Sequence, residues 1–118
     1  MSYVDGFVIA VPQANRARFI EHAQTLDGIF LECGATQVTE CWGEDVPEGK
    51  LTDFRRAVQA HADEAVVFSW VTWPDKVTRD AGMEKFMNDP RLDKAGAMPF
   101  DGKRMIFGGF VPVVSLPA

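Results

Sequence analysis

Residues 65–73 read Ala65-Val66-Val67-Phe68-Ser69-Trp70-Val71-Thr72-Trp73, and most of them are β-branched or aromatic. Residues of these types favour extended backbone, so the run predicts a β-strand. Side chains alternate between the two faces of a strand, so Phe68 and Trp70 share one face while Val67 and Val71 share the other. A strand that is apolar on both faces needs a covering layer on each side.

The rest of the chain alternates strands with helices. Apolar runs predict strands over residues 3–11, 36–42 and 104–114, and residues 52–58 fit a short strand of their own. Two stretches instead have apolar residues at helical spacing. The first runs from Asn15, a plausible N-cap, to Cys33, and the second runs from the predicted cap Asp75 to Asn88, just before Pro90.

This order of elements predicts an α+β protein with the ferredoxin-like arrangement β-α-β-β-α-β. We expect one domain over residues 1–118, with a four-stranded antiparallel sheet and two helices on one face. Two helices leave the second apolar face uncovered, so we expect a second copy of the chain to pack on it, sheet to sheet. The alternative cover is the long, acidic segment 44–64 folded over that face.

Charge and composition exclude several classes of protein. The 118 residues include 12 basic and 17 acidic ones, for a net charge of −5, which argues against nucleic acid or an anionic membrane as a partner. The longest apolar run, residues 105–114, is too short to span a membrane, and the first residues do not resemble a signal peptide. We therefore expect a cytoplasmic protein with Cys33 and Cys41 as reduced thiols, a disulfide between them being the alternative.

Several blocks of sequence carry a family resemblance. They are Tyr3-Val4-Asp5-Gly6-Phe7, Glu40-Cys41-Trp42, Asp45-Val46-Pro47, Thr52-Asp53-Phe54-Arg55, Val66-Val67-Phe68-Ser69-Trp70, Asp89-Pro90-Arg91, Met98-Pro99-Phe100-Asp101-Gly102-Lys103-Arg104-Met105-Ile106 and Gly108-Gly109-Phe110. These blocks resemble the YbaA-like family of small, uncharacterised bacterial proteins, and the run from Met98 to Ile106 is the most specific of them.

The resemblance implies membership of the dimeric α/β-barrel superfamily, in which two ferredoxin-like sheets close into one barrel across a dimer. Members of that superfamily include cofactor-free monooxygenases, haem-dependent enzymes, isomerases, stress proteins and ligand-sensing domains. A shared fold does not choose among these functions.

Four aromatic side chains are candidates for binding a ligand. Trp42, Phe54, Trp70 and Trp73 lie on or beside neighbouring predicted strands. Together with Phe7 and Phe107 they would line a cleft between the sheet and the helices, which is a usual place for an apolar ligand. The alternative is that they belong to the hydrophobic core.

Charged residues supply the candidates for chemistry. Asp5 and Glu40 are acids inside apolar strands, so each needs a partner or a proton if it is buried. The available partners are Arg55, Arg56, Lys103 and Arg104. A Glu40–Arg104 or an Asp53–Arg55 pair would be either a structural ion pair or the polar end of a ligand pocket. The candidate catalytic residues are therefore Glu40, Asp53, Arg55 and Arg104.

The sequence suggests no metal and no cofactor. His22 and His61 have no partner at metal-ligand spacing. The first hypothesis is a homodimer that binds a small apolar or aromatic ligand and, if catalytic, performs cofactor-free oxygenation or isomerisation. The second is a non-enzymatic stress or sensing dimer. Whether the protein is an enzyme is left open by its sequence.

Overall fold

Four strands form one antiparallel sheet in the computed structural model, which describes residues 2–117. The strands are β1 (Tyr3–Pro12), β2 (Gln37–Trp42), β3 (Glu64–Trp73) and β4 (Ile106–Phe110). Their order in the sheet is β2-β3-β1-β4, and every neighbouring pair is antiparallel. This is the ferredoxin-like topology that the sequence predicts.

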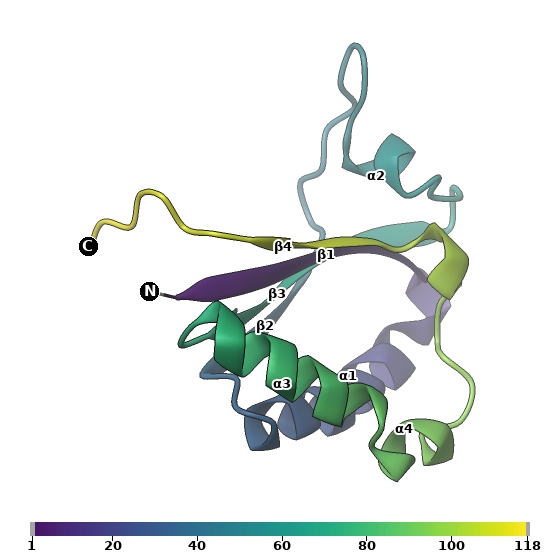
Figure 1. The fold of residues 1–118 in the computed structure, drawn as a ribbon. Helices are drawn as coiled ribbons and strands as arrows, with labels where there is room; N and C mark the ends of the chain where they lie inside the picture. The colour runs from purple at the N-terminus through teal and green to yellow at the C-terminus, as the bar shows by residue number, and fades with distance from the viewer. Residues whose placement is uncertain (1, 118) are drawn as a thin grey trace.

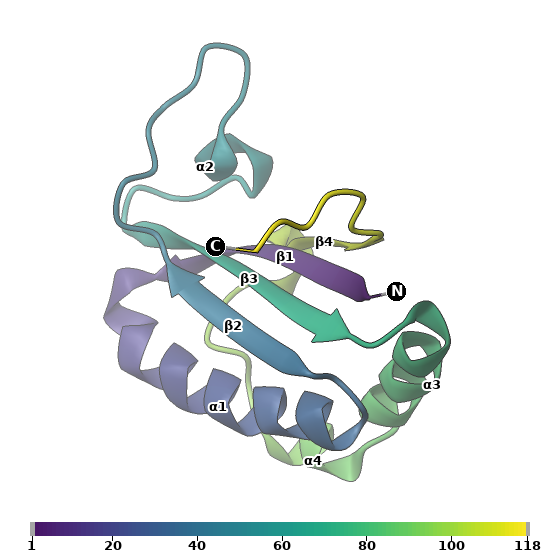
Figure 2. The ribbon, with the colours of Figure 1, turned by 90° about the vertical axis from the view of Figure 1, so that its left-hand side faces the viewer.

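Helices cover the two faces of the sheet unequally (Figure 1). The helices are α1 (Arg16–Glu32), α2 (Phe54–Ala57), α3 (Lys76–Met87) and α4 (Pro90–Lys94), with 3-10 turns at Gln13–Asn15 and Gly102–Arg104. Helices α1, α3 and α4 lie together on one face, and only the short α2 lies on the other (Figure 2). We call these the helix face and the open face. No helix within residues 2–117 is long and apolar enough to cross a membrane.

Three local predictions need correction. Residues 54–57 form helix α2 and not part of a strand, because the Asp53 carboxylate accepts a hydrogen bond from the Arg56 amide and caps a helical turn. The last strand is confined to residues 106–110, since Arg104 lies in a 3-10 turn. Asn15 precedes α1 without capping it, and its side-chain amide donates to the Pro99 carbonyl at 3.0 Å.

The core on the helix face is divided into two clusters. One contains Trp73, Phe30 and Phe86, and the other contains Val11 and Phe19. The side chain of Phe7, in the middle of β1, packs against both clusters. This division leaves room for a cavity between the sheet and the helices.

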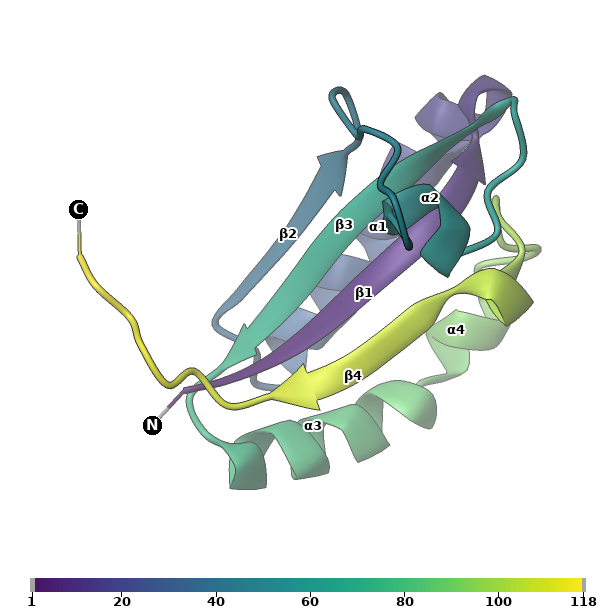
Figure 3. The same ribbon diagram turned by 90° about the horizontal axis from the view of Figure 1, so that it is seen from above.

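The open face is covered only at one end. There Val58, which follows α2, packs on Ala10 and Val66. Farther along the sheet Phe68, Ile106 and Phe110 are 46%, 44% and 61% exposed. Figure 3 looks onto this face and shows α2 above one end of it. The segment 44–64 is therefore only a partial cover. Both cysteines are free thiols, Cys33 at the end of α1 and Cys41 on β2.

Candidate ligand-binding site

One row of residues across the sheet contains the polar centre of the site. Glu40 on β2 pairs directly with Ser69 on β3, which in turn pairs with Phe7 on β1. Directly paired residues point to the same face of a sheet, and here that is the helix face. The register of the sheet therefore places a carboxyl group, a hydroxyl group and an aromatic ring side by side beneath the helices.

Helix α1 adds a second carboxyl group opposite this row. Asp27 follows Ala23 by four positions and precedes Phe30 by three, so it shares the helix face that packs on the sheet. Asp27 and Ser69 both lie beside the Glu40 side chain and influence its pKa. Two partly exposed carboxyl groups from distant parts of the chain thus come together between α1 and the sheet.

The carboxyl pair faces a cavity of about 440 Å³ between the sheet and the helices. Its remaining lining is almost entirely apolar, with His22 at one side. The apolar side chains are Phe7, Ile9, Phe19, Ala23, Leu26, Phe30, Val71, Phe86, Met87, Leu92, Met98, Phe100 and Met105. Much of the outer wall comes from the segment 87–105, which connects α3 to β4. The cavity is of the size and character of a small-molecule site.

Burial and mutual repulsion shift the acidities of the pair. Burial, followed by the charge of Asp27 and the hydrogen bond with it, raises the pKa of Glu40 to about 8. Burial likewise raises the pKa of Asp27 to about 6, although its hydrogen bond with Glu40 acts in the opposite direction. The two groups titrate as a unit that retains one proton near neutral pH. Such a unit can both donate and accept a proton.

A smaller hollow of about 220 Å³ adjoins the cavity on the outer side of α1. His22 lines both spaces, and burial lowers the pKa of its imidazole. Alternate residues of the segment 95–99 divide the two spaces, since Gly96 and Met98 line the cavity while Ala97 and Pro99 line the hollow. The segment is thus a thin wall between them.

The structure separates the four predicted ligand-binding aromatics. Trp73 is fully buried in the core, and its indole N–H donates to Asp5 at 2.9 Å. Trp70 lies on the open face, because three positions separate it from Trp73 and strand side chains alternate. Phe54, on α2, packs against Phe68 on that same face, with ring centroids 6.0 Å apart.

Trp42, the remaining predicted aromatic, lies on the helix face beside the cavity. Its ring packs against Phe19 with centroids 6.1 Å apart, and the Arg16 guanidinium lies 5.4 Å from its centre. Phe19 and Phe7 line the cavity, whereas none of the four predicted aromatics does. The aromatic wall is therefore built from phenylalanines, and the tryptophans lie elsewhere.

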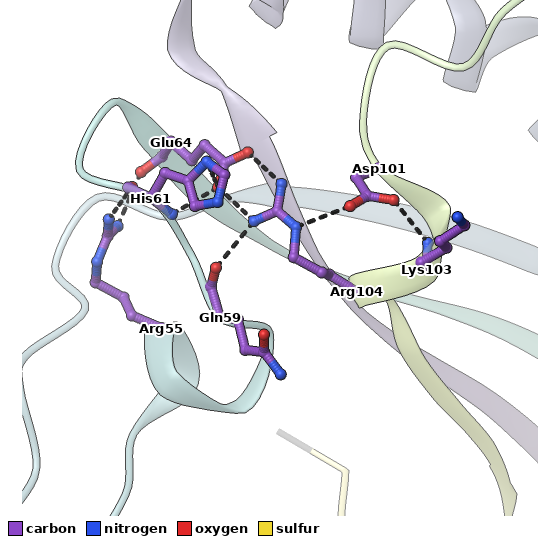
Figure 4. A network of polar contacts seen from close by, with 7 residues as sticks. All are labelled: Arg55, Gln59, His61, Glu64, Asp101, Lys103 and Arg104. Atoms are coloured by element: carbon purple, nitrogen blue, oxygen red, sulfur yellow. Dashed lines mark hydrogen bonds and ion pairs between the residues drawn. The ribbon is translucent and has the colours of Figure 1, made fainter.

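Of the four candidate catalytic residues, only Glu40 faces the cavity. The expected Glu40–Arg104 pair does not form, because Arg104 binds Glu64 through two contacts of 2.6 and 2.7 Å. Figure 4 shows Arg104 between Glu64 and Asp101. This guanidinium holds the pKa of Glu64 down at about 2. This network joins the start of β3 to the turn before β4, so Arg104 has a structural role.

The expected Asp53–Arg55 pair does not form either. The Asp53 carboxylate accepts hydrogen bonds from the amides of Arg56 and Gly49 and so organises the start of α2. Arg55 donates to the backbone carbonyls of His61 and Glu64, at 2.7 and 2.9 Å (Figure 4). Both residues stabilise the connection between β2 and β3, away from the cavity.

Asp5, the other buried acid that the sequence singles out, also has a structural partner. The Arg79 guanidinium contacts its two carboxylate oxygens at 2.8 and 3.1 Å, in addition to the bond from Trp73. That arginine comes from α3 and was not among the four expected cations. Asp5 therefore ties α3 to the sheet.

Sequence reasoning missed Asp27, although a signal was present. A charged residue in the middle of a helix usually lies on the solvent side. Asp27, however, follows Phe19 and Ala23 at intervals of eight and four, the spacing of the apolar stripe. Within residues 2–117, no group of three His, Cys, Asp or Glu side chains could hold a metal ion.

The sequence of the chain matches a family of proteins over most of its length. A family model described as "Protein of unknown function (DUF1428)" matches residues 2–102. The "Uncharacterized protein YbaA" of Escherichia coli (strain K12) is 52% identical over 115 residues, which cover 97% of this chain and 98% of that protein. The resemblance to the YbaA-like family is thereby confirmed.

Solved structures of similar fold have low sequence identity to the chain. SnoaB, a cofactor-independent oxygenase from Streptomyces nogalater, matches with a TM-score of 0.63 and 13% identity, over 99% of this chain and 98% of that one. A dimeric ferredoxin-like protein from an uncultured marine organism matches with a TM-score of 0.59 and 8% identity, over 98% of each chain. Both confirm the fold.

Proposed function

Because the chain belongs to the DUF1428 family of unknown function, its role rests on its own cavity, and we propose that it binds a small, largely apolar molecule there. The Asp27–Glu40 pair would contact the polar end of that molecule and exchange a proton with it. The observation that carries this proposal is the cavity of about 440 Å³, whose apolar wall surrounds two carboxyl groups.

The chemistry available at this site is proton transfer. A carboxyl pair that retains one proton near neutral pH holds both a general acid and a general base. Removal of a proton from a bound C–H or O–H acid is a step shared by isomerisation and by cofactor-free oxygenation. The oxygenase SnoaB, which has the same fold, is a precedent for the second reaction. A ligand sensor would use the same pair for binding alone.

A cavity-filling variant tests the binding proposal. Met98 lines the cavity yet is 51% exposed, so Met98→Trp should fill the space while the chain still folds. Val77→Trp is the matched control, because Val77 is exposed on α3 and does not line the cavity.

The readout is a thermal-shift and fluorescence titration with neutral two-ring aromatic compounds. We expect stabilisation of the wild-type protein and of Val77→Trp, and none of Met98→Trp. Equal stabilisation of both variants would place any binding outside the cavity and refute the proposal.

We further propose that the chain forms a homodimer through its open face. The exposed rings of Phe54, Phe68 and Phe110 lie there with Ile106, and a second copy packed on this face would remove these side chains from water. The dimeric ferredoxin-like protein of similar fold supports this assembly. Light scattering should give twice the chain mass of 13.1 kDa.

A charge on that face should separate the two copies. Phe110→Glu is expected to lower the measured mass to that of one chain. Leu31→Glu, which adds the same charge at an exposed apolar residue of α1, should leave it unchanged. A wild-type protein of single-chain mass at micromolar concentration would refute the dimer.

We also place the protein in the cytoplasm, without nucleic acid as a partner. The free thiols Cys33 and Cys41 suit a reducing compartment. The net charge of −5 opposes binding to phosphate backbones.

A further inference from the structure

The carboxyl pair, which is partly exposed, differs from the buried acids of residues 2–117 in having no cation. Asp5 and Glu64 are each 3% exposed, and each is held by an arginine, Arg79 and Arg104 respectively. For Asp27 and Glu40, the surroundings within residues 2–117 provide only each other and Ser69. The lining of the cavity likewise contains no lysine or arginine in that part of the chain. A partly buried carboxylate without a counter-charge is unfavourable, so the pair retains a proton, and a bound cation would supply positive charge in place of that proton.

The cavity wall suits a cation as well. Five phenylalanine rings line it, and two of them, Phe30 and Phe86, stack on each other so that each leaves one face uncovered by the other. The faces of aromatic rings carry partial negative charge and attract cations, most strongly where water is excluded. Met98 and Met105 add flexible, polarisable side chains that adapt to the shape of an apolar body. An apolar molecule with one positive charge would therefore satisfy both parts of the lining.

We propose that the ligand is a primary amine with an apolar, aromatic body, bound as its ammonium ion against Asp27 and Glu40. This inference rests on the proposed function and narrows it to one class of ligand. The three N–H donors of an ammonium group match the acceptors offered by two carboxyl groups and the Ser69 hydroxyl. A carboxylate ligand would instead place a third negative group beside the two carboxyl groups, and a neutral ligand would bring no positive charge to them.

The pH dependence of amine binding provides a second test. The ammonium ion favours the ionised form of the pair, so amine binding should strengthen as the pair loses protons with rising pH. The groups facing the pair are Ser69, which does not titrate in this range, and His22 at the side of the cavity. A protonated His22 at low pH would also oppose a cation, so a variant of Glu40 is needed to separate the two effects.

Three naphthalene compounds of similar size and different charge test the class of ligand by calorimetry. They are 1-naphthylmethylamine, 1-naphthalenemethanol and 1-naphthoate. At about pH 8 we expect the amine to bind at least about tenfold more tightly than the alcohol, and the carboxylate to bind most weakly. At about pH 5, where the pair is protonated, the preference for the amine over the alcohol should approach one. In the Glu40→Gln variant, the ratio of amine affinity to alcohol affinity at pH 8 should fall several-fold.

The possible failures are distinguishable. Amine and alcohol that bind equally at pH 8, both blocked by Met98→Trp, would overturn the amine class and leave the cavity as a binding site. A preference for the amine that Glu40→Gln does not reduce would overturn the role of the carboxyl pair. If none of the three compounds binds, or if Met98→Trp blocks none of them, the proposed function fails as well.

Discussion

The partly buried carboxyl pair should make the protein less stable as the pH rises, and Glu40→Gln should remove that loss of stability. Below about pH 4.5 the Glu40 side chain is protonated in both the folded and the unfolded chain. Between pH 4.5 and about 8 the unfolded chain releases this proton while the folded chain retains it. The unfolded state therefore gains stability relative to the folded state across that interval.

The size of the effect follows from the pKa of Glu40. The interval from 4.5 to about 8, at about 1.4 kcal/mol per pH unit, sets a ceiling of about 5 kcal/mol. The group is partly solvated and shares its proton with Asp27, so we expect less than half of that ceiling. Glu40→Gln should thus raise the free energy of unfolding by about 2 kcal/mol at pH 8 relative to its effect at pH 5.

Urea denaturation followed by tryptophan fluorescence measures this difference, with all proteins at one concentration because association affects stability. Glu44→Gln, at an exposed acid in the loop after β2, is the matched control for loss of a negative charge. It should change stability equally at both pH values. If Glu40→Gln behaves like this control, Glu40 ionises freely in the folded protein and the electrostatic description of the site is wrong.

Four further substitutions test the framework around the site by the same assay. Trp73→Phe removes a fully buried indole and its hydrogen bond, so unfolding free energy should fall by about 2–4 kcal/mol; a loss below about 1 kcal/mol would contradict the packing. Arg104→Met strips Glu64 of its partner. At pH 7 the urea midpoint of this variant should be lower than that of the wild type. The difference should become smaller as the pH falls from 4.5 to about 2, because Glu64 in the folded wild type is protonated over that range. Gly82→Ala places a methyl group against the Trp73 ring and should destabilise, whereas Gly28→Ala, with open space around it, should stabilise by about 0.5–1 kcal/mol. Equal effects of the two glycine substitutions would refute the close approach of α3 to β3.

The order of strands and helices was predictable because it depends on patterns within short stretches. The β-branched and aromatic run over residues 65–73 belongs to β3, and the apolar stripe from Phe19 to Phe30 is the buried side of α1. Asp75 caps α3 as expected, accepting from the Thr78 amide at 2.7 Å. The error over residues 52–58 arose because a four-residue helix is too short for periodicity to reveal.

The site was only partly predictable because it depends on which distant residues meet. Glu40 was identified as an acid inside an apolar strand, and that anomaly is visible in sequence. Its partner was not, since Asp27 comes from a helix in which acids are ordinary. The arginines expected to pair with Glu40 and Asp53 contact other groups, Arg104 binding Glu64 across 40 positions of the chain.

The sequence by itself determined the order of the four main strands and the two long helices, and the presence of an unexplained acid in β2. Short-range periodicity and steric preferences act within a few residues, so they can be recognised from the amino-acid sequence alone. Only the tertiary structure decided that Asp27 faces Glu40 across a cavity, and that the tryptophans lie outside it. Such contacts depend on sheet register and helix placement, where a shift of one residue moves a side chain to the opposite face.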